Sequence, residues 1–202
     1  MKAYLYLSKK SWAEPWIEGG YIPINLASTY KSEIRDGIYT PDENNIRRLD
    51  NLDEERFERI AKIGDSGIGK GSSIRIKVGK YIEGGKTIAT DIDFNAYYDD
   101  GYVVSFSQTC HKGLMERLNK EVCVEINDVN KIRRQISSQI GLKGKTRVCA
   151  YTSSKNRNHF LKSTKDDWQD EVRIFWKTVT SDPQTPKWVK IKSHMGKIIT
   201  FD

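Results

Sequence analysis

Two short stretches hold the side chains best suited to chemistry. The first is Ser105-Phe106-Ser107, which ends an alternating stretch that predicts a strand over residues 102–107. Side chains on a strand alternate between two faces, so we expect both hydroxyls on one face and Phe106 on the other. Two neighbouring hydroxyls can hold a sugar hydroxyl or orient a carboxylate. An ordinary edge strand with its serines in water is the simpler explanation, and this motif by itself favours it.

The second stretch is Gln169-Asp170-Glu171, which leads directly into an apolar strand predicted to run to Trp176. A carboxylate at a strand entrance, beside an aromatic side chain, can bind a ribose 2′-hydroxyl and stabilise a cationic sugar transition state. If the strand begins early, Gln169 and Glu171 share one face. The alternative is that Glu171 and Arg173 form a solvated ion-pairing face, as most charged residues do.

A third stretch, Gly64 to Lys70, has the glycine and lysine spacing of a phosphate-binding loop. Such a loop needs a hydroxyl at the next position, which is Gly71 here, and a helix after it. The residues that follow alternate as in a strand, with Ile74 and Ile76 on one side. A flexible loop is therefore favoured over a nucleotide site.

The histidines and cysteines do not have the spacing of metal ligands. His111 adjoins Cys110, whereas His159 and His194 stand alone, so we expect no metal ion. The three cysteines are odd in number and widely spaced, which argues against a disulfide framework and fits a reducing cytosol. No feature of the sequence supports a cysteine nucleophile paired with histidine.

Composition indicates a folded protein with a preference for polyanions. The chain has 202 residues and a net charge of +7, which favours a nucleic-acid partner or serves only solubility. No apolar run approaches the roughly 20 residues that cross a bilayer, and the N-terminus lacks the pattern of a signal peptide. We therefore expect a cytoplasmic protein that does not enter membranes.

The elements that must position the two motifs are short strands alternating with short helices. Alternation and turn residues predict strands over residues 3–8, 21–26, 73–78, 87–92, 102–107, 122–126, 147–152, 171–176, 188–191 and 197–201. Helical spacing and capping residues predict helices from Ser11 and over residues 50–63, 112–119 and 128–140. The proline-containing segment 182–186 is too short for a domain linker. The pattern predicts an α+β fold on a partly antiparallel sheet, as one domain of residues 1–202.

The two motifs, in this order, resemble the ADP-ribosyltransferase superfamily. In its arginine-serine-glutamate branch, a Ser-x-Ser strand and a later Gln/Glu-x-Glu turn frame the nicotinamide end of NAD. The second half is also similar to an uncharacterised bacterial domain family common near phage-defence genes. Its pattern is a Ser-Phe-Ser strand, a Leu-Met helix start, an apolar strand, then a lysine and an aromatic residue before Glu-x-Glu-x-Arg. The corresponding residues are Ser105 to Ser107, Leu114-Met115, residues 122–126, Lys162 and Trp168 to Arg173, with Gln169 in place of the first glutamate.

The resemblance implies a single catalytic domain of two packed, mostly antiparallel sheets with short peripheral helices. It implies that NAD is consumed, with Glu171 on the 2′-hydroxyl, Ser105 or Ser107 orienting Glu171, and Gln169 positioning the acceptor. The residues implied to line the NAD cleft are Tyr4, Tyr6, Ser8, Asn25, Tyr30 and Phe106. The superfamily's first-strand arginine has no counterpart, because residues 3–8 offer only tyrosines and a serine there.

The resulting hypothesis is a toxin or phage-defence effector that ADP-ribosylates RNA, DNA or protein, with an antitoxin or chaperone as a possible partner. One alternative is a non-enzymatic module that binds nucleic acid or an antitoxin. A metal-independent ribonuclease is a third possibility, although its general base cannot be located. The transferase hypothesis requires Ser105 and Glu171 to lie within about 10 Å, since catalytic groups must converge on one reacting centre.

Overall fold

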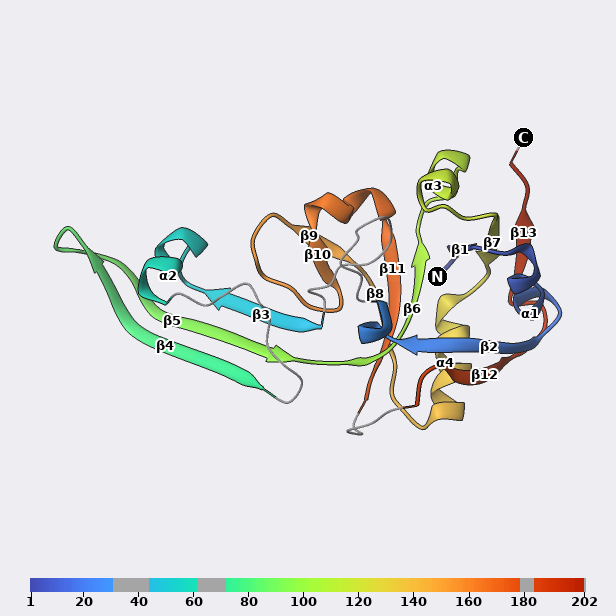
Figure 1. Cartoon of the computed structure of the whole chain (residues 1–202), viewed down its shortest axis with the longest axis horizontal. Coiled ribbons are helices and arrows are strands. Elements are labelled where there is room, and N and C mark those ends of the chain that lie inside the picture. The colour runs from blue at the N-terminus through green and yellow to red at the C-terminus, as the bar shows by residue number, and fades with distance from the viewer. Residues whose placement is uncertain (31–43, 62–71, 179–183, 202) are drawn as a thin grey trace. The chain divides into compact units, whose positions relative to one another are not determined.

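The computed structural model describes residues 1–30, 44–61, 72–178 and 184–201. The chain divides into two compact units (Figure 1). Unit 1 comprises Met1–Pro41, Asp100–Cys149 and Asp166–Asp202, and unit 2 comprises Asp42–Asp99 and Ala150–Lys165. Each unit has a hydrophobic cluster of its own. That residues 1–202 act as one catalytic domain stays a prediction.

Unit 1 is built on an eight-stranded antiparallel sheet. Its strands are β1 (Ala3–Leu7), β2 (Gly20–Leu26), β6 (Gly101–Ser107), β7 (Val122–Ile126), β8 (Lys145–Val148), β11 (Glu171–Lys177), β12 (Lys187–Ile191) and β13 (Gly196–Ile199). The main order is β12-β2-β6-β1-β7-β13, and β11 lies between β6 and β8. The predicted α+β class with mostly antiparallel sheets and short helices is confirmed.

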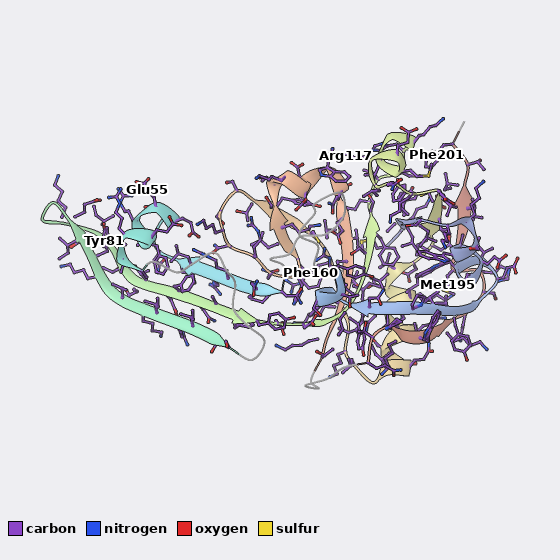
Figure 2. All side chains as sticks on the ribbon, viewed as in Figure 1. Glu55, Tyr81, Arg117, Phe160, Met195 and Phe201 are labelled. Atoms are coloured by element: carbon purple, nitrogen blue, oxygen red, sulfur yellow. The ribbon has the colours of Figure 1, made fainter. Side chains whose placement is uncertain are left out.

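The sheet divides along β6. The start of β6 pairs with β2, where Val103 lies opposite Asn25, whereas its last residue, Ser107, lies opposite Tyr4 of β1. On its other side β6 pairs with β11 along its whole length. One hydrophobic cluster takes apolar side chains from both branches and from the helices, including Leu5, Ile22, Trp16, Ile132 and Met195, the last of which is labelled in Figure 2. β6 therefore joins both branches of the sheet to a single core.

The helices of unit 1 are short. They are η1 (Lys10–Trp12), α1 (Glu14–Ile17), η2 (Ala27–Tyr30), α3 (Lys112–Arg117), α4 (Val129–Ile140) and η3 (Thr164–Gln169), the last of which begins in unit 2. The longest, α4, begins at the cap Asp128, whose side chain accepts a hydrogen bond from the backbone of Asn130. It ends at Gly141, whose φ of 70° is the left-handed conformation that glycine adopts without strain. The helix predicted over 128–140 is thus confirmed at both ends.

Unit 2 contains a three-stranded antiparallel sheet and a parallel strand pair. The sheet has the order β3 (Asn45–Asp50), β5 (Lys86–Tyr98) and β4 (Ser73–Glu83), and the pair is β9 (Ala150–Thr152) with β10 (Leu161–Ser163). Helix α2 (Glu54–Ile60) inserts Phe57 into the small core, where its ring stacks on Phe94 at a centroid distance of 4.7 Å. Glu83 of β4 accepts hydrogen bonds from Arg56 and Arg59 of α2.

Several predicted boundaries are wrong. The strand predicted over 147–152 is broken at Cys149 into β8 and β9, which belong to different sheets. β4 extends beyond the predicted 73–78 to Glu83, next to the Gly84-Gly85 turn, and β5 extends beyond the predicted 87–92 to Tyr98, because its second half also pairs with β3. β3 and β10 were not predicted. The loop Gly64 to Lys70 and residues 182–183 lie outside the described residues. Within the ranges described above, no helix is long and apolar enough to cross a membrane.

Candidate functional site

The structure brings the two predicted motifs side by side on neighbouring strands. Ser107 lies opposite Glu171 of β11 and, on its other side, opposite Tyr4 of β1. Ser105 lies opposite Arg173. Residues directly opposite in an antiparallel pair have Cα atoms about 4.5–5.5 Å apart and side chains on one face. Tyr4, Ser107 and Glu171 therefore form one row across the sheet, which meets the requirement that the two motifs converge.

Glu171 and Arg173 form a buried ion pair on this face. The Arg173 Nε donates to Glu171 Oε1 at 2.7 Å, and Nη2 donates to Oε2 at 3.0 Å. The side chain of Arg173 is 4% exposed and that of Glu171 is 3% exposed. The ion pair considered above is therefore present, but it is buried rather than solvated. A side-on guanidinium donates one hydrogen bond to each carboxylate oxygen. Arg173 thus holds the Glu171 carboxylate in one orientation.

Gln169 does not share a strand face with Glu171, because β11 begins at Glu171, as predicted, and not earlier. Gln169 is the last residue of η3, and Asp170 has a φ of 43°, which breaks the alternation. The turn is hydrogen-bonded to the end of β6. The Asp170 carbonyl accepts hydrogen bonds from the backbone N–H of Gln108 at 2.8 Å and from Ser107 Oγ at 3.5 Å. Gln169 is buried beside this turn, adjacent in sequence to the row that contains Glu171.

Asn25 and Tyr30 belong to the same region of unit 1. Asn25 lies opposite Val103 in β6, and Val103 is on the same face as Ser105 and Ser107 because strand side chains alternate. The side chain of Asn25 donates to the Tyr30 hydroxyl at 3.1 Å. One face of the sheet thus carries the side chains of Tyr4, Asn25, Ser105, Ser107 and Glu171. Tyr30 is hydrogen-bonded to this face through Asn25.

The remaining predicted residues have structural contacts. The hydroxyl of Tyr6 donates to the Thr109 carbonyl at 3.0 Å and accepts from the His111 backbone N–H at 3.2 Å. Ser8 accepts a hydrogen bond from Lys120 Nζ at 2.8 Å. Phe106 points into the main core, where its ring meets Trp16 edge to face at a centroid distance of 6.4 Å. Phe106 is on the face opposite the serines, so we do not include it in the proposed site.

Trp168 is the aromatic side chain expected near Glu171. It lies in η3, and the guanidinium of Arg117 at the end of α3, labelled in Figure 2, lies 3.7 Å from its ring centroid. This distance is well within the range of a cation–π interaction. Trp168 also packs against the small cluster formed by Tyr6, Leu114, Leu118 and Cys123. Its ring therefore joins the turn that leads into β11 to α3.

Similarity to known proteins does not identify the chemistry of this face. No protein-family model, curated protein or solved structure matches the chain. Among the residues with described coordinates, no group of three or more histidine, cysteine, aspartate or glutamate side chains is arranged to hold a metal ion. The function therefore has to be inferred from the row of side chains itself.

Two cysteines meet beside the row, which their spacing in the sequence did not indicate. Cys110 and Cys123 are free thiols whose sulfur atoms are 3.8 Å apart, and Cys123 lies opposite Tyr6 between β1 and β7. Burial, together with the neighbouring Cys110 thiol, raises the pKa of Cys123 to about 12. Burial also raises the pKa of the Tyr6 hydroxyl. Both groups are therefore held in their neutral forms at physiological pH.

These two shifts predict that unit 1 loses stability in alkali. A group whose pKa is raised by folding stabilises the native state below its unfolded pKa and loses this contribution as pH rises towards the folded pKa. For Cys123 the window runs from 9.0 to about 12, and Tyr6 adds to it above 10.0. We expect the free energy of urea unfolding to fall between pH 9 and 11, and to fall less steeply in Cys123→Ala. Equal slopes in both proteins would contradict the assignment.

Proposed function

We propose that the chain is an NAD-dependent ADP-ribosyltransferase with an ADP-ribosyltransferase-like fold and Glu171 as its central catalytic residue. The observation that carries the proposal is the row Tyr4, Ser107 and Glu171 across β1, β6 and β11. It joins the Ser-x-Ser and Gln-x-Glu motifs with the first strand, where the resemblance requires a residue at the NAD site. A tyrosine, Tyr4, takes the place of the superfamily's arginine there.

The side chains of this face suit the nicotinamide ribose of NAD. A carboxylate can accept a hydrogen bond from the ribose 2′-hydroxyl, and Glu171, oriented by Arg173, supplies a carboxylate on this face. Ser107, directly opposite, can contact the same ribose, and the rings of Tyr4 and Tyr30 are suited to stacking on nicotinamide. Asn25 holds the Tyr30 hydroxyl in place. The donor and acceptor set thus fits the sugar end of the dinucleotide.

NAD would supply an ADP-ribosyl group: the bond from ribose C1′ to nicotinamide breaks, nicotinamide leaves with the electron pair, and an acceptor that loses a proton forms the new bond at C1′. The Glu171 carboxylate stabilises the positive charge that develops on the sugar, since fixed charges aimed at a developing charge are worth most when they need no reorganisation. Arg173 acts as a positioning residue, because it fixes both Glu171 oxygens. Gln169, at the preceding turn, is assigned to the acceptor.

The acceptor is proposed to be RNA, DNA or protein, and the net charge of +7 favours nucleic acid. The biological role proposed is that of a toxin or phage-defence effector in the cytoplasm, where an antitoxin or chaperone can restrain it. A second candidate, a non-enzymatic nucleic-acid-binding or antitoxin-interacting module, is favoured by one observation. The Glu171–Arg173 pair is buried and bidentate, and such a pair also occurs as a purely structural element.

The test is to incubate the protein with labelled NAD and total RNA, DNA or cell lysate. We expect label transfer by the wild type and a loss of about 100-fold or more in Glu171→Gln, which removes the charge but keeps the shape. Glu125→Gln is the matched control. Glu125 lies opposite Tyr4 on the same face and is ion-paired with Lys2 at 2.7 Å.

Near-wild-type transfer in Glu125→Gln, with both variants folded by circular dichroism, would support the role of Glu171. Absence of NAD cleavage with every acceptor, or an equal loss in both variants, would overturn the transferase proposal. RNA fragments that appear without NAD would identify a nuclease instead.

A further inference from the structure

We propose that the outer face of β2 and β12 is a binding surface for single-stranded nucleic acid. This face consists of Tyr21 and Pro23 from β2 and Trp188 and Lys190 from β12, and we call it the β2–β12 face. It goes beyond the transferase proposal, because it needs neither NAD nor Glu171. Its two aromatic residues, Tyr21 and Trp188, are far apart in the sequence. Only the pairing of β2 with β12 makes them neighbours.

The register of the two strands puts these four side chains together. Trp188 lies opposite Pro23, and Lys190 lies opposite Tyr21. The alternate residues of both strands, among them Ile22, Ile24, Val189 and Ile191, are buried in the core of unit 1. The opposite face is therefore the outer one, and Tyr21 and Trp188 are diagonal neighbours on it, with Cα atoms about 7–8 Å apart.

These two rings are the most exposed large hydrophobic side chains in the described part of the chain. Tyr21 is 62% exposed and Trp188 is 60% exposed. Single exposed apolar residues are common and need no explanation, but two adjacent aromatic rings on a flat sheet face are a platform on which planar groups can stack. Sheets that bind RNA use exposed aromatic side chains in this way, with one base on each ring.

The positive charge near Tyr21 and Trp188 favours a polyanionic ligand. Described residues 19–30 and 184–201, which contain β2 and β12, include no aspartate or glutamate. The same segments carry Lys190, which lies opposite Tyr21 on this face, and Lys192 just after β12. Lysines around exposed rings match the two features of a single strand, a phosphate backbone and unstacked bases.

The free edge of β12 is partly covered by α4, which favours the face over the edge for a partner. The side-chain amide of Gln139 in α4 donates to the Lys190 carbonyl at 2.7 Å and accepts from the Lys190 N–H at 2.7 Å. Gln135, one turn earlier, accepts from the N–H of Lys192 at 3.5 Å. A peptide that adds a strand to a sheet needs these backbone groups unpaired. A ligand that stacks on side chains does not.

The experiment measures binding of a fluorescein-labelled 20-nucleotide single-stranded oligouridylate to the full chain without NAD, by fluorescence anisotropy. We expect Trp188→Ala and Tyr21→Ala each to weaken binding about tenfold or more, and Trp188→Phe to retain most of it, because stacking needs only a ring. Trp12→Ala is the matched control, since Trp12 is also exposed (51%) but lies in η1. Its binding should equal that of the wild type.

A second pair of variants tests whether lysines on this face contact the phosphates of the ligand. Lys190→Gln should reduce the slope of log binding constant against log salt by about 0.7, the value for one phosphate contact on a single strand. Lys80→Gln, an exposed lysine on β4 in unit 2, should not change it. Absent binding, equal binding by Trp188→Ala and Trp12→Ala, or duplex bound as tightly as the single strand would overturn the proposal. Binding of a protein instead, lost in Trp188→Ala, would assign the face to a protein partner. None of these results bears on NAD cleavage.

Discussion

Replacing Arg173 with leucine is expected to destabilise unit 1 by about 3–5 kcal/mol, the usual cost of removing one partner from a buried ion pair. The Glu171 carboxylate would lose the guanidinium that contacts both its oxygens and would remain almost fully buried. An ionised carboxylate is costly to bury once a counter-charge has been removed. The cost therefore comes from the charge left behind rather than from the lost packing of the arginine stem.

Urea unfolding followed by tryptophan fluorescence measures this change, because all five tryptophans of the chain lie in unit 1. The double variant Glu171→Gln/Arg173→Leu should recover much of the loss, since neither charge then remains buried. Lys2→Gln is the control: it breaks the ion pair between the exposed Lys2 side chain and Glu125 and should change stability far less than Arg173→Leu does. A similar small loss in Arg173→Leu would show that the pair is solvated in solution.

Replacing Trp176 alone with alanine is expected to lower the free energy of unfolding by about 3–5 kcal/mol. Trp176 is completely buried in the core of unit 1, and its indole N–H donates to Ser137 Oγ of α4 at 2.8 Å. The backbone around it leaves no spare space. A Cβ added at Gly144 would lie 2.3 Å from Trp176 Nε1, so the ring fits directly against that glycine.

Thermal unfolding monitored by circular dichroism tests this prediction. Trp176→Phe should lose less than Trp176→Ala, because it keeps most of the ring but loses the hydrogen bond. Gly144→Ala should also destabilise, since the indole has to move. Trp188→Ala, an exposed site, should change stability by less than about 0.5 kcal/mol. If Trp176→Ala were as mild as Trp188→Ala, the packing described for this core would be refuted.

Local sequence patterns correctly predicted the ends of one helix and the faces of one strand. The cap residue Asp128 and the terminal Gly141 marked both ends of α4, because capping depends on residues within a turn of the helix end. Alternation over residues 102–107 correctly predicted that Ser105 and Ser107 share one face and that Phe106 lies on the other, but not that this other face is the core rather than the NAD cleft. Patterns of this kind are properties of a few consecutive residues.

Other features were decided only by the tertiary structure. The segment over 147–152 alternates like one strand, yet it breaks at Cys149 because its two halves pair with different partners, β11 and β10. Whether Gln169 shares a face with Glu171 depended on where the strand begins, and the left-handed Asp170, whose carbonyl accepts from the backbone of Gln108, keeps Gln169 out of β11. In both places long-range pairing overrides local propensity.

The sequence by itself determined the α+β class, the two motifs and the basic charge. It did not determine that Ser107 lies between Tyr4 and Glu171, that the Glu171–Arg173 pair is buried, or that Tyr21 and Trp188 share an exposed face. These features depend on which strands pair and in which register, and in unit 1 the register is fixed by burying one face of most strands in a common core. That choice involves residues far apart in the chain, so no local pattern contains it.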